Sequence, residues 1–168
     1  MSKVPVSLKS RLRLVAAFVY DFDGVMTDNR VLVFSDGSEA VFCNRADGWG
    51  VAQLKKMGYR QSILSTETNP VVARRAKKLG LPFIQGARDK GAAFFKYMAT
   101  VGLRPEQVAY VGNDVNDLPA MKHAGFKIAP QDASREILAI ADWITEAKGG
   151  FGVIYEIFKA VHSLKFAR

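Results

Sequence analysis

The chain has 168 residues, a length that predicts one domain with a sizeable core. Hydrophobic residues make up 49% and charged residues 24%, as in an ordinary globular protein. The 24 basic and 16 acidic residues give a net charge of +8, which favours an anionic partner. Without zinc-finger spacing or an aromatic-basic ribonucleoprotein pattern, that partner is not expected to be a nucleic acid.

The compartment is predicted from the cysteine and the N-terminal region. Cys43 is the only cysteine and cannot form an internal disulfide, which favours a reducing cytoplasm. The basic residues Lys3, Lys9, Arg11 and Arg13 precede an apolar run, as in a signal peptide. However, this run is short and ends in acidic residues rather than at a cleavage site, so we interpret it as a buried strand. No segment approaches the length of a membrane span, and no membrane partner is expected.

Apolar runs separated by turn residues predict strands and helices that alternate along the chain. The first half is expected to hold a strand at 16–20, a hairpin with arms at 31–34 and 39–43, a helix at 47–57, a strand at 61–64 and a helix at 70–79. The second half is expected to hold a strand at 81–84, a helix at 89–101, a strand at 108–111, a helix at 118–123, strands at 126–129 and 141–144, and a helix at 153–161.

This alternation predicts an α/β fold with a doubly wound, mainly parallel sheet and helices on both faces. No repeat, low-complexity tract or linker divides the sequence, so residues 1–168 are expected to form one domain. Within it, we interpret 29–44 as a β-hairpin insertion and 146–168 as a C-terminal tail. No inserted stretch is long enough for a separate cap domain.

Acidic residues crowd the end of the first predicted strand, in the run Tyr-Asp-Phe-Asp-Gly-Val-Met-Thr-Asp at 20–28. Asp21 and Asp23 would share one face of a regular strand, and their repulsion needs a counter-charge. Mg²⁺ suits such a site because it binds one or two carboxylates together with waters and a substrate phosphate. The pattern therefore indicates metal-assisted phosphoryl transfer, and the alternative is a solvated acidic turn.

Further polar residues fall at other strand ends or helix starts. In a doubly wound sheet the carboxyl ends of the strands meet at one edge, where ligands bind. We therefore expect these residues to converge: Asp21, Asp23, Ser65, Thr66, Lys90, Asn113, Asp114 and Asp117.

The expected cluster suits phosphate chemistry. Asp21 could attack phosphorus, and Asp23 could protonate the leaving group and then activate water. Ser65 and Lys90 could bind phosphoryl oxygens. Mg²⁺ would be held by Asp21, the main-chain carbonyl of Asp23 and the cluster at 113–117. The alternatives are that Ser65 only caps a turn, that Lys90 is solvated, and that Asp117 is an acidic residue at the start of a helix.

These motifs, in this order, resemble those of the haloacid dehalogenase superfamily of phosphotransferases. Residues 21–28 resemble its first motif, Ser65 and Lys90 occupy its second and third, and Gly-Asn-Asp-Val-Asn-Asp at 112–117 occupies its fourth. The hairpin, the run at 44–50 and the Gly-Gly-Phe-Gly tail at 149–152 resemble the capless branch, which hydrolyses phosphorylated octulosonic and nonulosonic acids.

The resemblance implies further properties of the site. It implies a homotetramer in which the hairpin packs between subunits. It also implies substrate-binding residues at Asp47, Thr66 and Glu67, and at Arg75 and Lys78, which would reach the substrate carboxylate of a neighbouring subunit. For the last two, the sequence alone favours an exposed basic helix face. Glu67 resembles the nine-carbon branch, because the octulosonate enzymes commonly carry Gly-Arg after the motif-two threonine. The alternative is that Glu67 only forms a salt bridge.

One residue departs from the family pattern. Asn113 stands where the family usually has a metal-binding aspartate, and its amide oxygen brings no charge to Mg²⁺. Asp114 or Asp117 could compensate. The Gly-Asn start also resembles phosphatase-like domains attached to acylneuraminate cytidylyltransferases. A weakly catalytic or non-catalytic assembly module with a cytidylyltransferase partner is therefore the alternative, and the presence of Asp21, Asp23, Ser65 and Lys90 favours catalysis.

Overall fold

A six-stranded parallel sheet organises the chain, in a computed structural model that describes residues 6–166. Its strands lie in the order β5-β4-β1-β6-β7-β8. Every neighbouring pair is parallel, which confirms the predicted doubly wound fold. The bounds are β1 Ala17–Tyr20, β4 Arg60–Leu64, β5 Phe83–Ile84, β6 Val108–Val111, β7 Phe126–Ala129 and β8 Trp143–Ile144.

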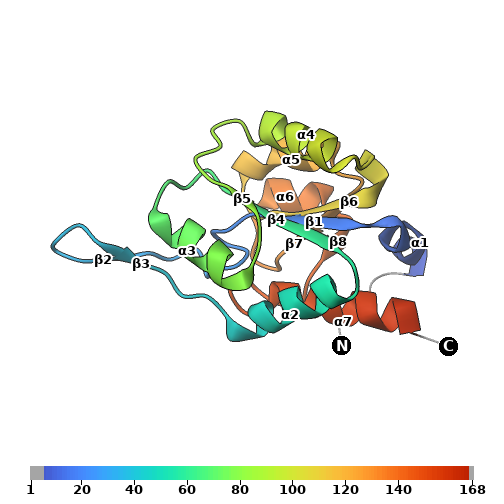
Figure 1. The fold of residues 1–168 in the computed structure, drawn as a ribbon, viewed down its shortest axis with the longest axis horizontal. Coiled ribbons are helices and arrows are strands. Elements are labelled where there is room, and N and C mark those ends of the chain that lie inside the picture. The colour runs from blue at the N-terminus through green and yellow to red at the C-terminus, as the bar shows by residue number, and fades with distance from the viewer. Residues whose placement is uncertain (1–5, 167–168) are drawn as a thin grey trace.

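Helices cover both faces of this sheet (Figure 1). On one face lie α2 (Arg45–Lys56), α3 (Pro70–Leu79) and α7 (Val153–Phe166), and on the other lie α4 (Lys90–Val101), α5 (Leu118–His123) and α6 (Arg135–Ile140). A hydrophobic core lies on each face of the sheet, and alternate residues of β1 pack into one or the other. Phe18 and Tyr20 pack with the first group, whereas Ala17 and Val19 pack with the second.

Capping residues explain where the helices begin and end. The side chains of Asn44, Asn69 and Asp89 accept hydrogen bonds from the first turns of α2, α3 and α4. Gly80 and Gly102 end α3 and α4 with φ angles of +63° and +64°, which glycine adopts without strain. Because Asn44 caps α2, that helix begins two residues earlier than the sequence pattern predicts.

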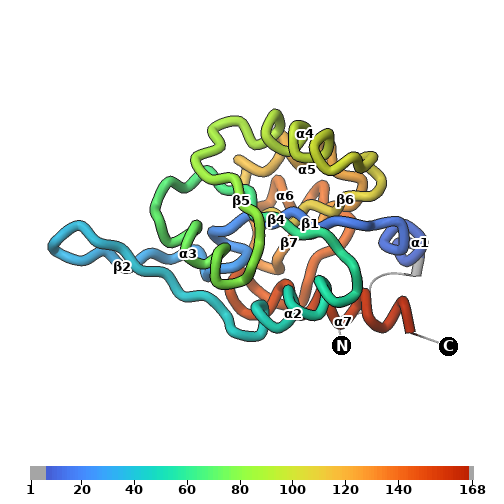
Figure 2. Tube along the Cα trace, viewed as in Figure 1, coloured from blue at the N-terminus to red at the C-terminus, as the bar shows by residue number. Residues whose placement is uncertain are grey.

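The predicted hairpin extends away from the body of the molecule, at the left of Figure 2. Its antiparallel strands, β2 (Leu32–Val33) and β3 (Glu39–Ala40), are shorter than expected. The hairpin exposes five large apolar side chains: Val31, Leu32, Val33, Phe34 and Phe42. No separate cap domain occurs among residues 6–166. The hairpin occupies the segment between β1 and α2.

The sequence pattern did not predict two of the α-helices in residues 6–166. Helix α1 (Val6–Leu14) occupies much of the basic N-terminal region, and Arg11 forms an ion pair of 2.8 Å with Asp142. Lys3 lies outside the described residues. The other missed helix, α6, is only six residues long and buries Ile137. Of the helices in residues 6–166, none has the length and hydropathy to cross a membrane.

Candidate active site

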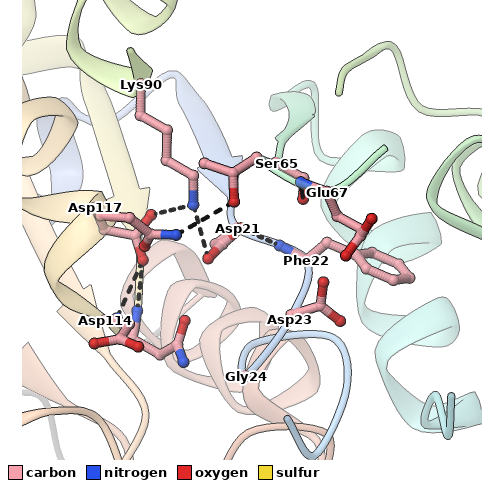
Figure 3. A network of polar contacts seen from close by, with 12 residues as sticks. Asp21, Phe22, Asp23, Gly24, Ser65, Glu67, Lys90, Asp114 and Asp117 are labelled. Carbon is pink, nitrogen blue, oxygen red and sulfur yellow. Dashed lines mark hydrogen bonds and ion pairs between the residues drawn. The ribbon is translucent and has the colours of Figure 1, made fainter. Parts of the chain in front are cut away.

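The carboxyl edge of the sheet brings four segments together. Asp21 directly follows β1, Ser65 follows β4 and Asn113 lies two residues beyond β6, while Lys90 is the first residue of α4. Figure 3 shows the Lys90 side chain reaching between Asp21 and Asp117. The structure thus places these residues, which are far apart in sequence, in one cluster.

Lys90 forms the centre of a buried ion-pair network. Its ammonium lies 2.8 Å from Asp21 Oδ2 and 2.7 Å from Asp117 Oδ1. All three residues are at least 96% shielded from solvent. A lysine buried so completely requires compensating charge, and the two carboxylates supply it. Lys90 is therefore not a solvated surface residue.

Asp117 uses both carboxylate oxygens within the protein. Besides Lys90, Oδ1 accepts a hydrogen bond of 2.8 Å from the Tyr110 hydroxyl. Oδ2 accepts from the backbone amides of Asn113 at 2.9 Å and Asp114 at 3.3 Å. Tyr110 was not predicted as a site residue, because an aromatic residue within an apolar strand is typical of a core. These contacts fix Lys90 and the loop after β6.

Burial dominates the ionisation of the cluster. It raises the pKa of Asp21 above its usual range, helped by the negative charge of Asp117 and opposed by Lys90. Burial also raises the pKa of Asp23, while a hydrogen bond from Thr27 opposes the shift. Burial lowers the pKa of Lys90, but Asp21 and Asp117 outweigh it and the pKa is raised, so the ammonium stays charged.

Three oxygens can converge beside this network. The amide end of Asn113 lies 2.8 Å from the Asp23 carbonyl oxygen and 3.2 Å from Asp21 Oδ2. With its NH₂ turned inward, Asn113 donates to both oxygens. With its oxygen turned inward, three acceptors meet and require a cation between them. This donor set fits a hard divalent cation. Because it includes a carbonyl and an amide, it does not form a cluster of three His, Cys, Asp or Glu side chains, and residues 6–166 contain no such cluster.

The other predicted metal ligand, Asp114, has a different environment. It is exposed, and its carboxylate accepts a hydrogen bond of 2.7 Å from the backbone amide of Val115. It therefore caps the short helix η2 (Val115–Asp117).

Glycines allow close packing around the loop that follows β1. Gly24 has φ of +76°, and a Cβ on it would overlap the Asn113 side chain. Gly149 and Gly150 lie against the same loop, and Gly150 N donates to the Val25 carbonyl at 3.0 Å. The tail before α7 therefore braces the loop that carries Asp23.

The loop after β4 lies beside the cluster. Ser65 is buried, and its hydroxyl accepts a hydrogen bond of 3.0 Å from the Glu67 amide. Thr66 is exposed and accepts from Asn116 at 3.4 Å. One carboxylate oxygen of Glu67 accepts from the amides of Thr68 and Asn69. Figure 3 shows the Glu67 side chain near Asp23.

Three predicted substrate-binding residues form no hydrogen bond or ion pair with the cluster within residues 6–166. The Asp47 carboxylate is buried and caps α7, accepting from the amides of Ile154 at 2.8 Å and Tyr155 at 3.0 Å. Arg75 donates to the Asn44 carbonyl at 2.9 Å. Lys78 is exposed on α3. Their proposed contact with substrate stays a prediction.

Comparison with known proteins identifies the family. A model of haloacid dehalogenase-like hydrolases matches residues 55–157, more than half of the chain. The chain belongs to the haloacid dehalogenase-like hydrolase family. The hydrolase is 33% identical over 144 residues to a 3-deoxy-D-manno-octulosonate 8-phosphate phosphatase of Yersinia pestis, covering 85% of this chain and 77% of the relative. Together with the hairpin in place of a cap, this similarity assigns it to the capless branch and makes it a phosphatase.

Solved structures agree with this assignment. A HAD family hydrolase from Streptomyces avermitilis is 44% identical, with a TM-score of 0.85 and coverage of 91% of this chain and 86% of that one. A 3-deoxy-D-manno-octulosonate 8-phosphate phosphatase from Moraxella catarrhalis, solved with magnesium, phosphate and KDO, is 30% identical. Its TM-score is 0.90, and the match covers 94% of this chain and 91% of that one.

Proposed function

We propose that this hydrolase is a Mg²⁺-dependent phosphatase that acts on a phosphorylated sugar acid through an aspartyl-phosphate intermediate. The observation that carries the proposal is the meeting of Asp21, Asp23 and Lys90 with an oxygen donor set at one sheet edge. The activity of the Yersinia relative supports the substrate class.

In the first step, an Asp21 carboxylate oxygen attacks phosphorus and the bond from phosphorus to the leaving oxygen breaks. Asp23 gives its proton to that oxygen, a role for which its raised pKa is suited. In the second step, Asp23 takes a proton from water as the water oxygen attacks phosphorus. Inorganic phosphate leaves, and Asp21 returns to its carboxylate form.

Lys90 and Ser65 stabilise the phosphoryl group. The Lys90 ammonium, held by Asp117, already contacts Asp21 and offers positive charge where phosphoryl oxygens gather. The Ser65 hydroxyl, whose oxygen accepts from Glu67 N, keeps its own proton for donation to a phosphoryl oxygen.

Asp21, the Asp23 carbonyl and the Asn113 amide oxygen would hold the cation. Mg²⁺ bound there supplies positive charge that offsets repulsion between the nucleophile and the phosphate. The magnesium in the Moraxella structure supports this choice of ion. We assign Asp117 to Lys90 positioning rather than to direct coordination, because both of its oxygens already accept protein hydrogen bonds. We assign Asp114 to loop capping, because one of its oxygens accepts from the Val115 amide.

Two features bear on substrate size and assembly. The relatives support an eight-carbon ester as the first substrate to test, whereas Glu67 favours a nine-carbon one. The exposed apolar hairpin supports a homotetramer, in which other subunits would cover these side chains. The alternative of an assembly module for a cytidylyltransferase is less well supported, because Asp21, Asp23, Ser65 and Lys90, the residues to which we assign catalytic roles, are all present.

Phosphate release tests the proposal. The protein should release phosphate from octulosonate 8-phosphate or a nonulosonate 9-phosphate with Mg²⁺, stop on addition of EDTA and resume with excess Mg²⁺. The Asp21→Asn variant, checked for folding by circular dichroism, should be inactive. Release that continues unchanged in EDTA would contradict the metal requirement, and no release from any of these esters would contradict the substrate class.

A further inference from the structure

A cleft of about 270 Å³ opens beside Asp23, between the hairpin and the loop before α3. Its lining residues include Asp23 from the loop after β1, Arg30 and Glu39 from the hairpin segment, Glu67 and Asn69 from the loop before α3, and Val71 from α3 itself. Because Asp23 is the proposed proton donor to the leaving group, the leaving group must occupy space next to it. The cleft is such a space.

Glu39 is fixed in the wall of this cleft. Asn69 Nδ2 donates a hydrogen bond of 2.8 Å to Glu39 Oε2. The orientation of the Asn69 amide is set in turn by α3, because its oxygen accepts from the Val71 amide at 3.0 Å. The hairpin carboxylate is thus tied to the body of the molecule at the mouth of the active site.

The charges of the cleft are unbalanced. Glu39 and Glu67 add two carboxylates to that of Asp23. Among the described residues that line the cleft, Arg30 carries the only positive charge. Its guanidinium is already paired with Asp28, to which it donates at 2.6 and 2.9 Å. A protein with a net charge of +8 therefore presents negative charge where the leaving group binds.

We infer that Glu39, together with Glu67, selects leaving groups whose arm next to the phosphate carries hydroxyls and rejects those that carry a carboxylate there. Carboxylates accept hydrogen bonds from hydroxyls and repel another anion. This inference rests on the proposed function and refines it. In an octulosonate 8-phosphate, carboxylate and phosphate lie at opposite ends, so only hydroxyls would enter the cleft.

Two three-carbon esters test the inference. In sn-glycerol 3-phosphate the carbon furthest from the phosphate bears a hydroxyl, and in 3-phosphoglycerate it bears a carboxylate. The parent protein should prefer the first by at least about tenfold in kcat/KM. High salt should narrow the preference, because screening weakens repulsion between charges.

The Glu39→Gln variant isolates the charge, because glutamine keeps an oxygen that accepts from Asn69. It should narrow the preference by about three- to tenfold, mainly through a lower KM for 3-phosphoglycerate. The matched control is Glu106→Gln, which removes an exposed charge near the amino end of β6 and should leave the preference unchanged.

The outcomes separate the inference from the proposed function. If E39Q and E106Q have the same preference as the parent, the charge filter is wrong although the protein is an active phosphatase. If the parent releases phosphate from neither test ester nor any sugar-acid phosphate, the proposed function itself fails. A preference that is insensitive to salt would also contradict a filter that works by charge.

Discussion

Lys90 and Asp21 form a buried ion pair of 2.8 Å that joins the start of α4 to the end of β1. Asp117 shares the same ammonium, so one buried cation serves two carboxylates. Removing the cation and removing one carboxylate therefore have opposite effects on charge balance.

The Asp21→Asn variant should lose turnover but keep its stability. Lys90 retains Asp117, and one buried negative charge is removed, so the midpoint of thermal unfolding at pH 7 should equal or exceed that of the parent. Lys90→Met should also be inactive but should lose about 3–5 kcal/mol of unfolding free energy, because two buried carboxylates lose their counter-charge. Denaturant titration of both variants measures this contrast, and equal losses would contradict it.

Asn113→Asp should strengthen binding of Mg²⁺ by about tenfold or more, because it adds a charge to the donor set. In EDTA, the same variant should unfold at a lower temperature than the parent, since the new carboxylate faces Asp21. Calorimetric titration with Mg²⁺ and thermal unfolding in EDTA measure the two effects. Asn116→Asp, on an exposed residue of the same loop, is the control. Unchanged Mg²⁺ affinity would contradict the placement of Asn113.

Asp47 should make stability depend on pH. Burial raises its pKa to about 6 in the folded protein, compared with about 3.9 in an unfolded chain. The folded protein thus binds an extra proton between these values, and the free energy of unfolding falls as pH rises from about 4 to about 6. The loss is no more than about 3 kcal/mol and is complete above this window.

Asp47→Asn should remove this pH dependence, because asparagine still accepts from the amides of Ile154 and Tyr155 without titrating. Urea unfolding of parent and variant at several pH values between 4 and 7 compares the slopes. The KM for substrate should stay unchanged if Asp47 acts only as a cap of α7. A raised KM would instead support the contact with substrate that the family resemblance implies.

Gly149→Ala should lower stability by about 1–3 kcal/mol, because its Cβ would overlap the backbone of Gly24. The displaced loop carries Asp23, so kcat should fall as well. Gly48→Ala is the control: it lies within α2, where its Cβ would meet only flexible side chains and alanine favours the helix. Equal activity and stability in the two variants would contradict the bracing role of the tail.

Local sequence signals predicted much of the fold. The bounds of β6, β7, α3 and α5 match the expected ranges, because each is an apolar or amphipathic run ended by glycine, proline or polar residues. Helices α1 and α6 were missed because neither has a strong periodic pattern. Both depend on distant contacts, such as that of Arg11 with Asp142.

The sequence by itself determined which residue types stand at the strand ends, and hence that acids, an amide and a lysine would meet at one edge of a parallel sheet. Only the tertiary structure decided how they divide their tasks. Asp117 was a candidate metal ligand in the sequence, but its oxygens contact Lys90, Tyr110 and two backbone amides. Burial and hydrogen-bond partners decide such roles, and both come from residues that lie far apart along the chain.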